Sequence, residues 1–260
     1  MSGLAKRKPL VLKSRRLVQA GWHLSLYPEA REAAGVFRTT NDWNTGRRGE
    51  PGVSSQPERT RRVAAGRAGA KLRRYVVANR LNRLGTLTYA GEGCHDPVIL
   101  RRDVGEFFRR LRLALEADAF PYAWVAEWHP GGHGLHVHFA VGQFVRRSLI
   151  ASAWGRGFVH IKLLGDLAVG SGPVDEARKA AGYLAKYVSK AFDERRVAGL
   201  HRYEVAQGFQ PRVVAVSALH LDDLVLSAGE CMGALPVEVS HSDSWQTWSG
   251  PTAVVMTWAS

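Results

Sequence analysis

Two short strand-like runs joined by a glycine-rich turn constrain the fold of this chain more than any other feature. Residues 122–128 and 135–141 are rich in β-branched and aromatic residues, and residues 129–134 (HPGGHG) between them form a turn. Strands joined by so short a connection run antiparallel. The sequence therefore predicts a β-hairpin within a mainly antiparallel sheet.

The pattern around this hairpin predicts further strands and helices. Strands are expected over residues 84–89, 157–163 and 213–216, and helices over residues 147–154, 174–192 and a stretch that begins at Asp103 with Glu106 as a capping box. Residues 1–60 look irregular, and the pattern weakens from Leu219 onward. The expected fold class is α+β, with a central antiparallel sheet and helices packed on it.

The charge of the chain is concentrated at one end. Residues 1–80 hold 18 Lys and Arg against 5 Asp and Glu, which equals the whole formal net charge of +13. A basic arm on a neutral body predicts a polyanion partner, most often nucleic acid, although a solubilising tail has the same composition. A basic helix over residues 59–74 is the expected DNA-binding element. Its candidate residues are Arg61, Arg62, Arg67, Lys71, Arg73 and Arg74.

Cysteine content and hydropathy exclude several classes. The chain has two cysteines, Cys94 and Cys231, too few for a disulfide framework or a four-thiolate zinc site. No apolar run is long enough to span a membrane or to serve as a signal peptide. We therefore expect a cytoplasmic protein without a membrane partner.

The triplet His136-Val137-His138 carries the most specific chemical signal. Side chains alternate along a strand, so the two imidazoles leave one face while the apolar residues beside them leave the other. If the turn is tight around Gly132 and His133, Glu127 on the preceding strand lies opposite His138 on the same face. Two imidazoles and a carboxylate suit a divalent cation, with Mn²⁺ or Mg²⁺ expected and Zn²⁺ chemically possible. The alternative is a chance pair of histidines on a sheet surface.

The helix predicted over residues 174–192 carries two tyrosines one turn apart. Tyr183 and Tyr187 lie on the shoulder of its apolar stripe, and Lys186 and Lys190 lie close to them. A tyrosine with a pKa of about 10 is a poor nucleophile at neutral pH, and a nearby ammonium group lowers that pKa. The pair is therefore a candidate nucleophile, unless these are boundary tyrosines beside solvated lysines.

Three segments in this order give the chain a family resemblance. Residues 86–89 (TLTY), 135–139 (LHVHF) and 182–190 (GYLAKYVSK) resemble the motifs of the HUH endonuclease superfamily, specifically the rolling-circle replication initiators of small phages and plasmids. The two-tyrosine form looks like that of gene A type phage initiators and related actinobacterial plasmid proteins. Residues 80–217 would then be the endonuclease domain, with a partly flexible basic region over 1–79 and a C-terminal extension over 218–260.

The resemblance implies a fold and a chemistry. The family has an antiparallel sheet with the histidine strand at its centre and the tyrosine helix beside it. By resemblance, His136 and His138 bind the metal with a carboxylate such as Glu127. Tyr183 or Tyr187 then attacks a phosphodiester of single-stranded origin DNA, which leaves a 5′-phosphotyrosine and a free 3′-OH. Lys186 or Lys190 assists.

Two departures and three rival interpretations accompany this resemblance. The chain lacks the cysteine-rich stretch of related plasmid proteins, and it lacks a G-x-x-x-x-G-K-[ST] motif, so unwinding needs a separate host helicase. The rivals are another HUH enzyme (a relaxase or a single-strand transposase), a non-catalytic DNA-binding protein of replication control, and a zinc hydrolase. Relaxases usually place the tyrosine before the histidines, and the transposases usually carry one tyrosine.

Overall fold

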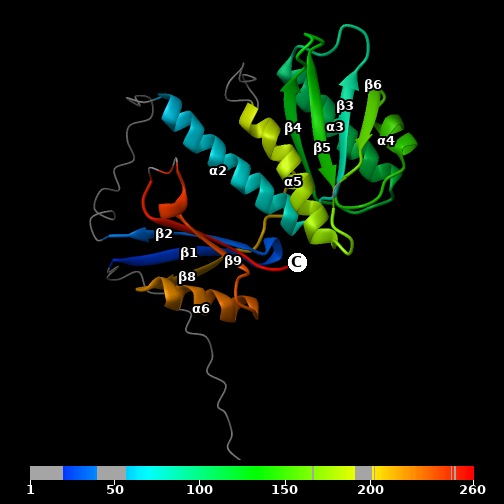
Figure 1. Cartoon of the computed structure of the whole chain (residues 1–260). Coiled ribbons are helices and arrows are strands. Elements are labelled where there is room, and N and C mark those ends of the chain that lie inside the picture. Colours follow the sequence, from blue (N-terminus) through cyan, green and yellow to red (C-terminus); the bar gives the residue numbers. More distant parts are fainter. Residues whose placement is uncertain are drawn as a thin grey trace, which may run out of the picture.

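The computed structural model describes residues 20–39, 57–165, 167–190, 201, 203–246, 248 and 250–260, with the side chains of residues 57–62 and 189–190 excepted. The fold class is α+β, as predicted, but these residues form two five-stranded antiparallel sheets where the sequence led us to expect one (Figure 1). We call the sheet β6-β3-β5-β4-β7 the central sheet, and the sheet β8-β1-β2-β10-β9 the terminal sheet.

The central sheet contains the predicted hairpin. Its strands are β3 (Arg83–Tyr89), β4 (Tyr122–Trp128), β5 (Leu135–Val141), β6 (Gly157–Lys162) and β7 (Glu204–Val205). The hairpin is formed by β4 and β5, and β3 pairs with the other side of β5. The histidine strand β5 therefore lies in the middle of the sheet, where both of its neighbours hold it in register.

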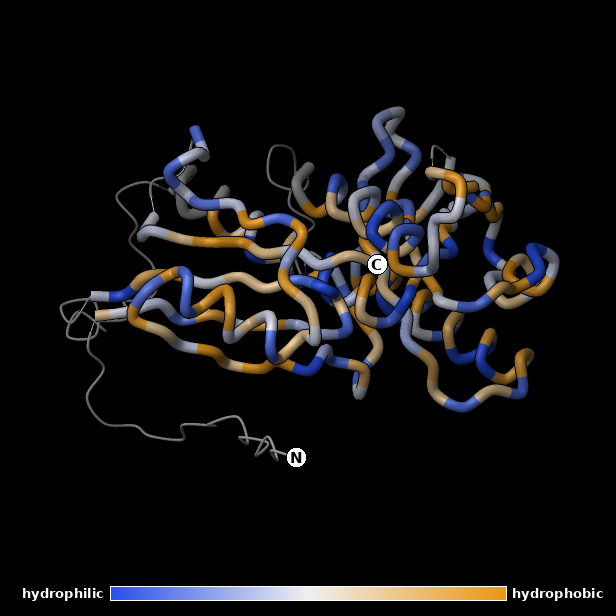
Figure 2. Tube along the Cα trace, turned by 60° about the horizontal axis from the view of Figure 1, so that its bottom comes forward, coloured by the Kyte–Doolittle hydropathy of each residue, from blue (hydrophilic) through white to orange (hydrophobic). Residues whose placement is uncertain are grey.

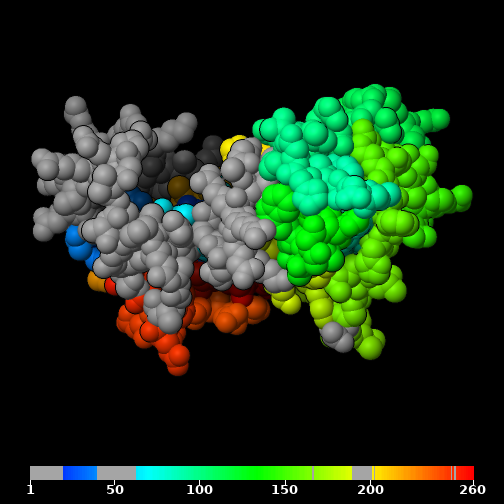
Figure 3. Space-filling view, turned by 90° about the horizontal axis from the view of Figure 1, so that it is seen from above, coloured from blue at the N-terminus to red at the C-terminus, as the bar shows by residue number. Residues whose placement is uncertain are grey.

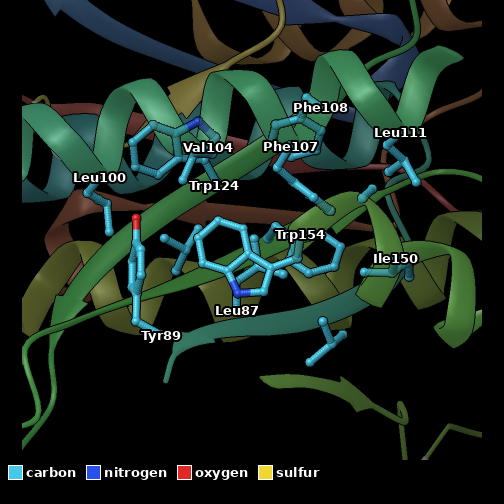
Figure 4. Close-up of a cluster of buried hydrophobic side chains, with 14 of the residues drawn as sticks. Leu87, Tyr89, Leu100, Val104, Phe107, Phe108, Leu111, Trp124, Ile150 and Trp154 are labelled. Atoms are coloured by element: carbon cyan, nitrogen blue, oxygen red, sulfur yellow. The ribbon is translucent and has the colours of Figure 1, made fainter. Parts of the chain in front are cut away.

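One face of the central sheet is covered by α3 (Pro97–Ala114) and α4 (Arg147–Trp154). Large apolar side chains from both helices meet those of the strands in one buried cluster (Figure 4). Trp154 is fully buried there, and its indole Nε1 donates a hydrogen bond to the carbonyl oxygen of Thr88 at 3.1 Å. This contact attaches α4 to the end of β3.

Helix α3 begins earlier than the predicted capping box. The side chain of Asp96 caps it by accepting hydrogen bonds from the backbone N–H groups of Val98 and Ile99, and Pro97 is its first residue. Asp103 instead lies inside the helix, where it is buried and pairs with Arg156 at 3.0 Å. The expectation that Asp103 begins the helix was therefore wrong, because its carboxylate serves a tertiary ion pair.

The opposite face of the central sheet is covered by α5 (Pro173–Lys190), which packs along α2 (Pro57–Ala78) (Figure 1). The apolar stripe predicted for α5 is buried against this face. Its described members are Ala177, Ala180, Leu184 and Val188. Burial of this stripe turns one shoulder of the helix, with its two tyrosines, toward β4 and β5.

The terminal sheet joins the two ends of the chain. Its elements are β1 (Gly21–Tyr27), β2 (Glu32–Arg38), β8 (Val214–Ala218), β9 (Glu238–His241) and β10 (Ala253–Thr257), with helix α6 (Leu221–Met232) packed on one face. The 3-10 turns η1 (Pro28–Ala30) and η2 (Ser242–Ser244) connect or follow these strands. Residues 21–38 are therefore a regular hairpin rather than irregular chain. Figure 2 shows apolar residues along these strands and on the helix beside them.

Helix α2 connects the two sheets. Near its end, Arg74 forms an ion pair with Glu32 of β2 at 2.8 Å, and its guanidinium lies 4.3 Å from the centre of the Tyr27 ring. In Figure 3 the central-sheet segment, in green, lies to one side of the segments that form the terminal sheet, in blue and orange. Within the described part of the chain, no helix has the length and apolar character needed to cross a membrane.

Candidate active site

The register of the β4–β5 hairpin differs from the predicted one by two residues. Glu127 pairs with His136, where a tight turn had placed it opposite His138. The turn is wider, because the backbone N–H of His129 bonds to the carbonyl of Gly134. A shift of two residues keeps each side chain on its face. Glu127, His136 and His138 therefore share one face, and the Glu127 carboxylate reaches His138 diagonally.

Two threonines of β3 contact the inner nitrogen of each histidine. Thr86 pairs with His138 in the sheet, and its Oγ1 lies 3.0 Å from His138 Nδ1. Thr88 Oγ1 lies 3.5 Å from His136 Nδ1. Since a hydroxyl both donates and accepts, each threonine can pair with either tautomer of its histidine. Residues 86–89, the weakest of the three motifs, thus contact both imidazoles.

The outer nitrogens of the two imidazoles lie in different surroundings. The Nε2–H of His138 donates to Glu127 Oε2 at 2.9 Å, and His138 is 6% exposed. The Nε2 atom of His136 is buried without a hydrogen-bond partner among the described residues. Burial, followed by the neighbouring imidazoles, lowers the pKa of His136 to about 4. His136 therefore stays neutral near pH 7 and keeps a free lone pair on one ring nitrogen.

These groups have the donor types of a divalent cation site. Among the residues described, no three His, Cys, Asp or Glu side chains are arranged as a ready metal site, and His138 bonds directly to Glu127. The unpartnered Nε2 of His136 is nevertheless the kind of buried polar atom that a metal satisfies. Hydroxyls on both Nδ1 atoms also match the outer contacts that orient metal-binding histidines. The residues therefore fit a cation bound by two Nε2 atoms and a carboxylate.

The turn histidines lie closer to this group than the sequence indicated. His129 is exposed, but its ring stacks on that of His136 with 4.5 Å between centroids. His133 is half-buried, and its Nε2 lies 3.1 Å from the carbonyl oxygen of Tyr89. The expectation that both are simple solvated loop residues therefore holds only for the exposure of His129.

The two tyrosines of α5 stand directly against the histidine face. The ring of Tyr187 stacks on the imidazole of His138, with 3.7 Å between centroids and 15° between planes. The phenol oxygens of Tyr187 and Tyr183 are 2.7 Å apart. Burial, and then the hydrogen bond to Tyr183, raises the pKa of Tyr187. This shift is opposite to the lowering by lysine that the sequence suggested, because Tyr187 is partly enclosed by the sheet.

A different lysine lies beside the tyrosine pair. The Nζ atom of Lys162, at the end of β6, is 4.9 Å from the centre of the Tyr183 ring. Lys186 is exposed on α5, and the side chain of Lys190 lies outside the described residues. Sequence reasoning missed Lys162 because it is distant from both tyrosines along the chain. The only sequence signal was its position at the end of a predicted strand.

The predicted DNA-binding residues of α2 divide into three groups. Arg67, Lys71 and Arg73 are exposed. Arg74 is half-buried in the ion pair with Glu32 described above, so its guanidinium serves the joint between α2 and the terminal sheet. The side chains of Arg61 and Arg62 lie outside the described residues. The exposed three remain the candidates for phosphate contacts.

Comparison with known proteins agrees with this site. The fold and the site define an α+β protein in which a His-x-His strand faces a pair of helical tyrosines. Residues 82–192, less than half of the chain, match the sequence model of a family described as replication-associated protein ORF2. This span runs from the start of β3 to the end of α5, and it supports a place among replication initiators. No curated protein and no solved structure matches the chain.

Proposed function

We propose that this chain is a metal-dependent enzyme that nicks and rejoins single-stranded DNA at a specific site and so initiates rolling-circle replication. The observation that carries the proposal is the stacking of Tyr187 on His138, with Tyr183 in hydrogen-bond contact. This arrangement sets two candidate nucleophiles against a face with two imidazoles and a carboxylate. A purely structural role for the histidines leaves the paired phenols unexplained.

The geometry ranks the two tyrosines. Tyr187 keeps its proton, because its pKa is raised, and donates it in the hydrogen bond to the oxygen of Tyr183. That bond stabilises negative charge on Tyr183, as does the ammonium group of Lys162. Tyr183 is therefore the first nucleophile, and Tyr187 is its hydrogen-bond donor and the second nucleophile.

The reaction conserves the energy of the broken DNA linkage. The phenol oxygen of Tyr183 forms a bond to phosphorus, and the bond from phosphorus to the 3′ oxygen breaks. One phenol proton is lost and one proton is taken up by the 3′ oxygen, which leaves as a hydroxyl. A Mn²⁺ or Mg²⁺ ion held by Glu127, His136 and His138 would supply charge relief on the phosphate oxygens. Attack by a 3′-OH on the phosphotyrosine rejoins the strand without a nucleotide cofactor.

A denaturing gel tests this function. Single-stranded oligonucleotides tiled across the DNA that encodes the chain and its flanks are incubated with the protein and Mn²⁺. The expected result is a protein band shifted by covalently attached DNA, together with a shortened oligonucleotide that ends in 3′-OH. EDTA removes both products. Binding without cleavage across the whole tiling series would instead indicate a non-catalytic replication-control protein.

A further inference from the structure

Strand β6 presents three side chains on the same face as the candidate active site. Phe158, His160 and Lys162 alternate along the strand, so they point to one side of the sheet. All three are exposed, and Phe158 is 68% exposed. Val159, between them, is 4% exposed and packs into the core on the other face.

The register places this row beside the histidines. Phe158 pairs with Thr88, and His160 pairs with Thr86, the two residues whose hydroxyls contact the site imidazoles. Adjacent strands lie about 4.8 Å apart, so β6 is about 10 Å from the histidine strand β5. At the far end of the row, Lys162 reaches the ring of Tyr183. The row thus runs along one side of the site, from the level of His136 to the nucleophile.

The chemistry of the row matches an unpaired nucleic acid strand. An exposed aromatic ring offers a face on which a base can stack, and neighbouring cationic or hydrogen-donating groups can contact phosphates. In this row the imidazole of His160 and the ammonium group of Lys162 provide those contacts. An exposed phenylalanine on an edge strand is otherwise a liability, because it favours unwanted strand pairing.

We infer that Phe158, His160 and Lys162 form a platform that holds single-stranded DNA next to the phosphate to be cleaved. Phe158 stacks on one base, while His160 and Lys162 contact the backbone that leads to Tyr183. This inference rests on the proposed function and adds to it the surface that recognises the substrate. The stack requires an unpaired base, so the platform selects single strands over duplex.

The test compares two exposed phenylalanines. Phe158→Ala is the platform variant, and Phe144→Ala, at a 76% exposed phenylalanine in the loop before α4, is the matched control. Fluorescence anisotropy in EDTA measures the Kd of the full chain for a fluorescein-labelled single strand of mixed sequence. Phe158→Ala should weaken binding about five-fold to a hundred-fold, the range for loss of one base–aromatic stack. Phe144→Ala should bind like wild type, and Phe158→Trp should restore affinity.

Two further measurements separate this inference from a general loss of structure and from the proposed function. Affinity for a duplex of the same sequence should stay unchanged in Phe158→Ala, whereas misfolding would reduce both affinities. Equal single-strand affinity of Phe158→Ala and wild type would overturn the platform, even where wild type still forms the covalent adduct. A weakened Phe158→Ala in a chain whose wild type forms no adduct would overturn the nicking function and leave the platform in place.

Discussion

Replacing Thr86 by valine removes one hydroxyl from the inner side of His138 and keeps the size of the side chain. The hydrogen bond is 3.0 Å long, and His138 is 6% exposed, so water has little access to Nδ1. A buried polar atom left without a partner costs about 1–3 kcal/mol in the free energy of unfolding. Loss of such an outer contact lowers metal affinity about 10- to 100-fold, or roughly 1.4–2.7 kcal/mol.

Calorimetric titration with Mn²⁺ and urea denaturation in EDTA measure these two effects separately. Thr88→Val is the matched control, because its hydroxyl is 3.5 Å from His136 Nδ1, at the limit of a hydrogen bond, and should matter less. Thr86→Ser retains the hydroxyl and should restore most of the affinity. Mn²⁺ binding by Thr86→Val as tight as that of wild type would refute the positioning role of Thr86.

Other positions give independent tests of the basic helix, the core and the histidine face. Joint alanine substitution of Arg67, Lys71 and Arg73 should flatten the slope of log Kd against log salt for a single strand by about 2 in anisotropy titrations; an unchanged slope would remove this face from the DNA interface. Trp154→Phe loses a buried indole donor and should lower the free energy of unfolding by roughly 2–3 kcal/mol in urea; a loss near zero would contradict its role in joining α4 to β3. The pKa of His136 is lowered from 6.5 to about 4, so between these pH values the unfolded chain binds a proton that the folded chain does not. Stability in EDTA should therefore fall by on the order of 1–2 kcal/mol as the pH drops through this window, and His136→Gln should flatten that part of the curve.

The parts of the fold that sequence reasoning predicted depend on local periodicity. The β4–β5 hairpin and the apolar stripe of α5 are written in alternation and in helical spacing over a few residues. The face shared by Glu127, His136 and His138 followed from the same alternation. The exact pairing did not, because a six-residue turn and a tighter turn share the composition HPGGHG, and only the backbone bond from His129 to Gly134 fixes the register.

The terminal sheet was missed because its pairings are non-local. Strand β1 pairs with β8, nearly two hundred residues later, and no local pattern reports such a partner. Strand β2 (EAAGVFR) is also rich in Ala and Gly, which have low β propensity, so it does not read as a strand by itself. Lys162 was missed for a related reason: the pairing of β6 with β3 and the packing of α5 together bring it to Tyr183.

The covalent adduct is the most direct test of the central claim that the tyrosine pair of α5 cuts DNA. Wild type, Tyr183→Phe, Tyr187→Phe and the double variant are incubated with an oligonucleotide that contains the nick site and with Mn²⁺, and adduct and rejoined product are quantified on denaturing gels. The account predicts that Tyr183→Phe loses most of the first adduct, that Tyr187→Phe still forms an adduct but rejoins poorly, and that the double variant forms none. An adduct that persists in the double variant would place the nucleophile elsewhere and contradict the mechanism.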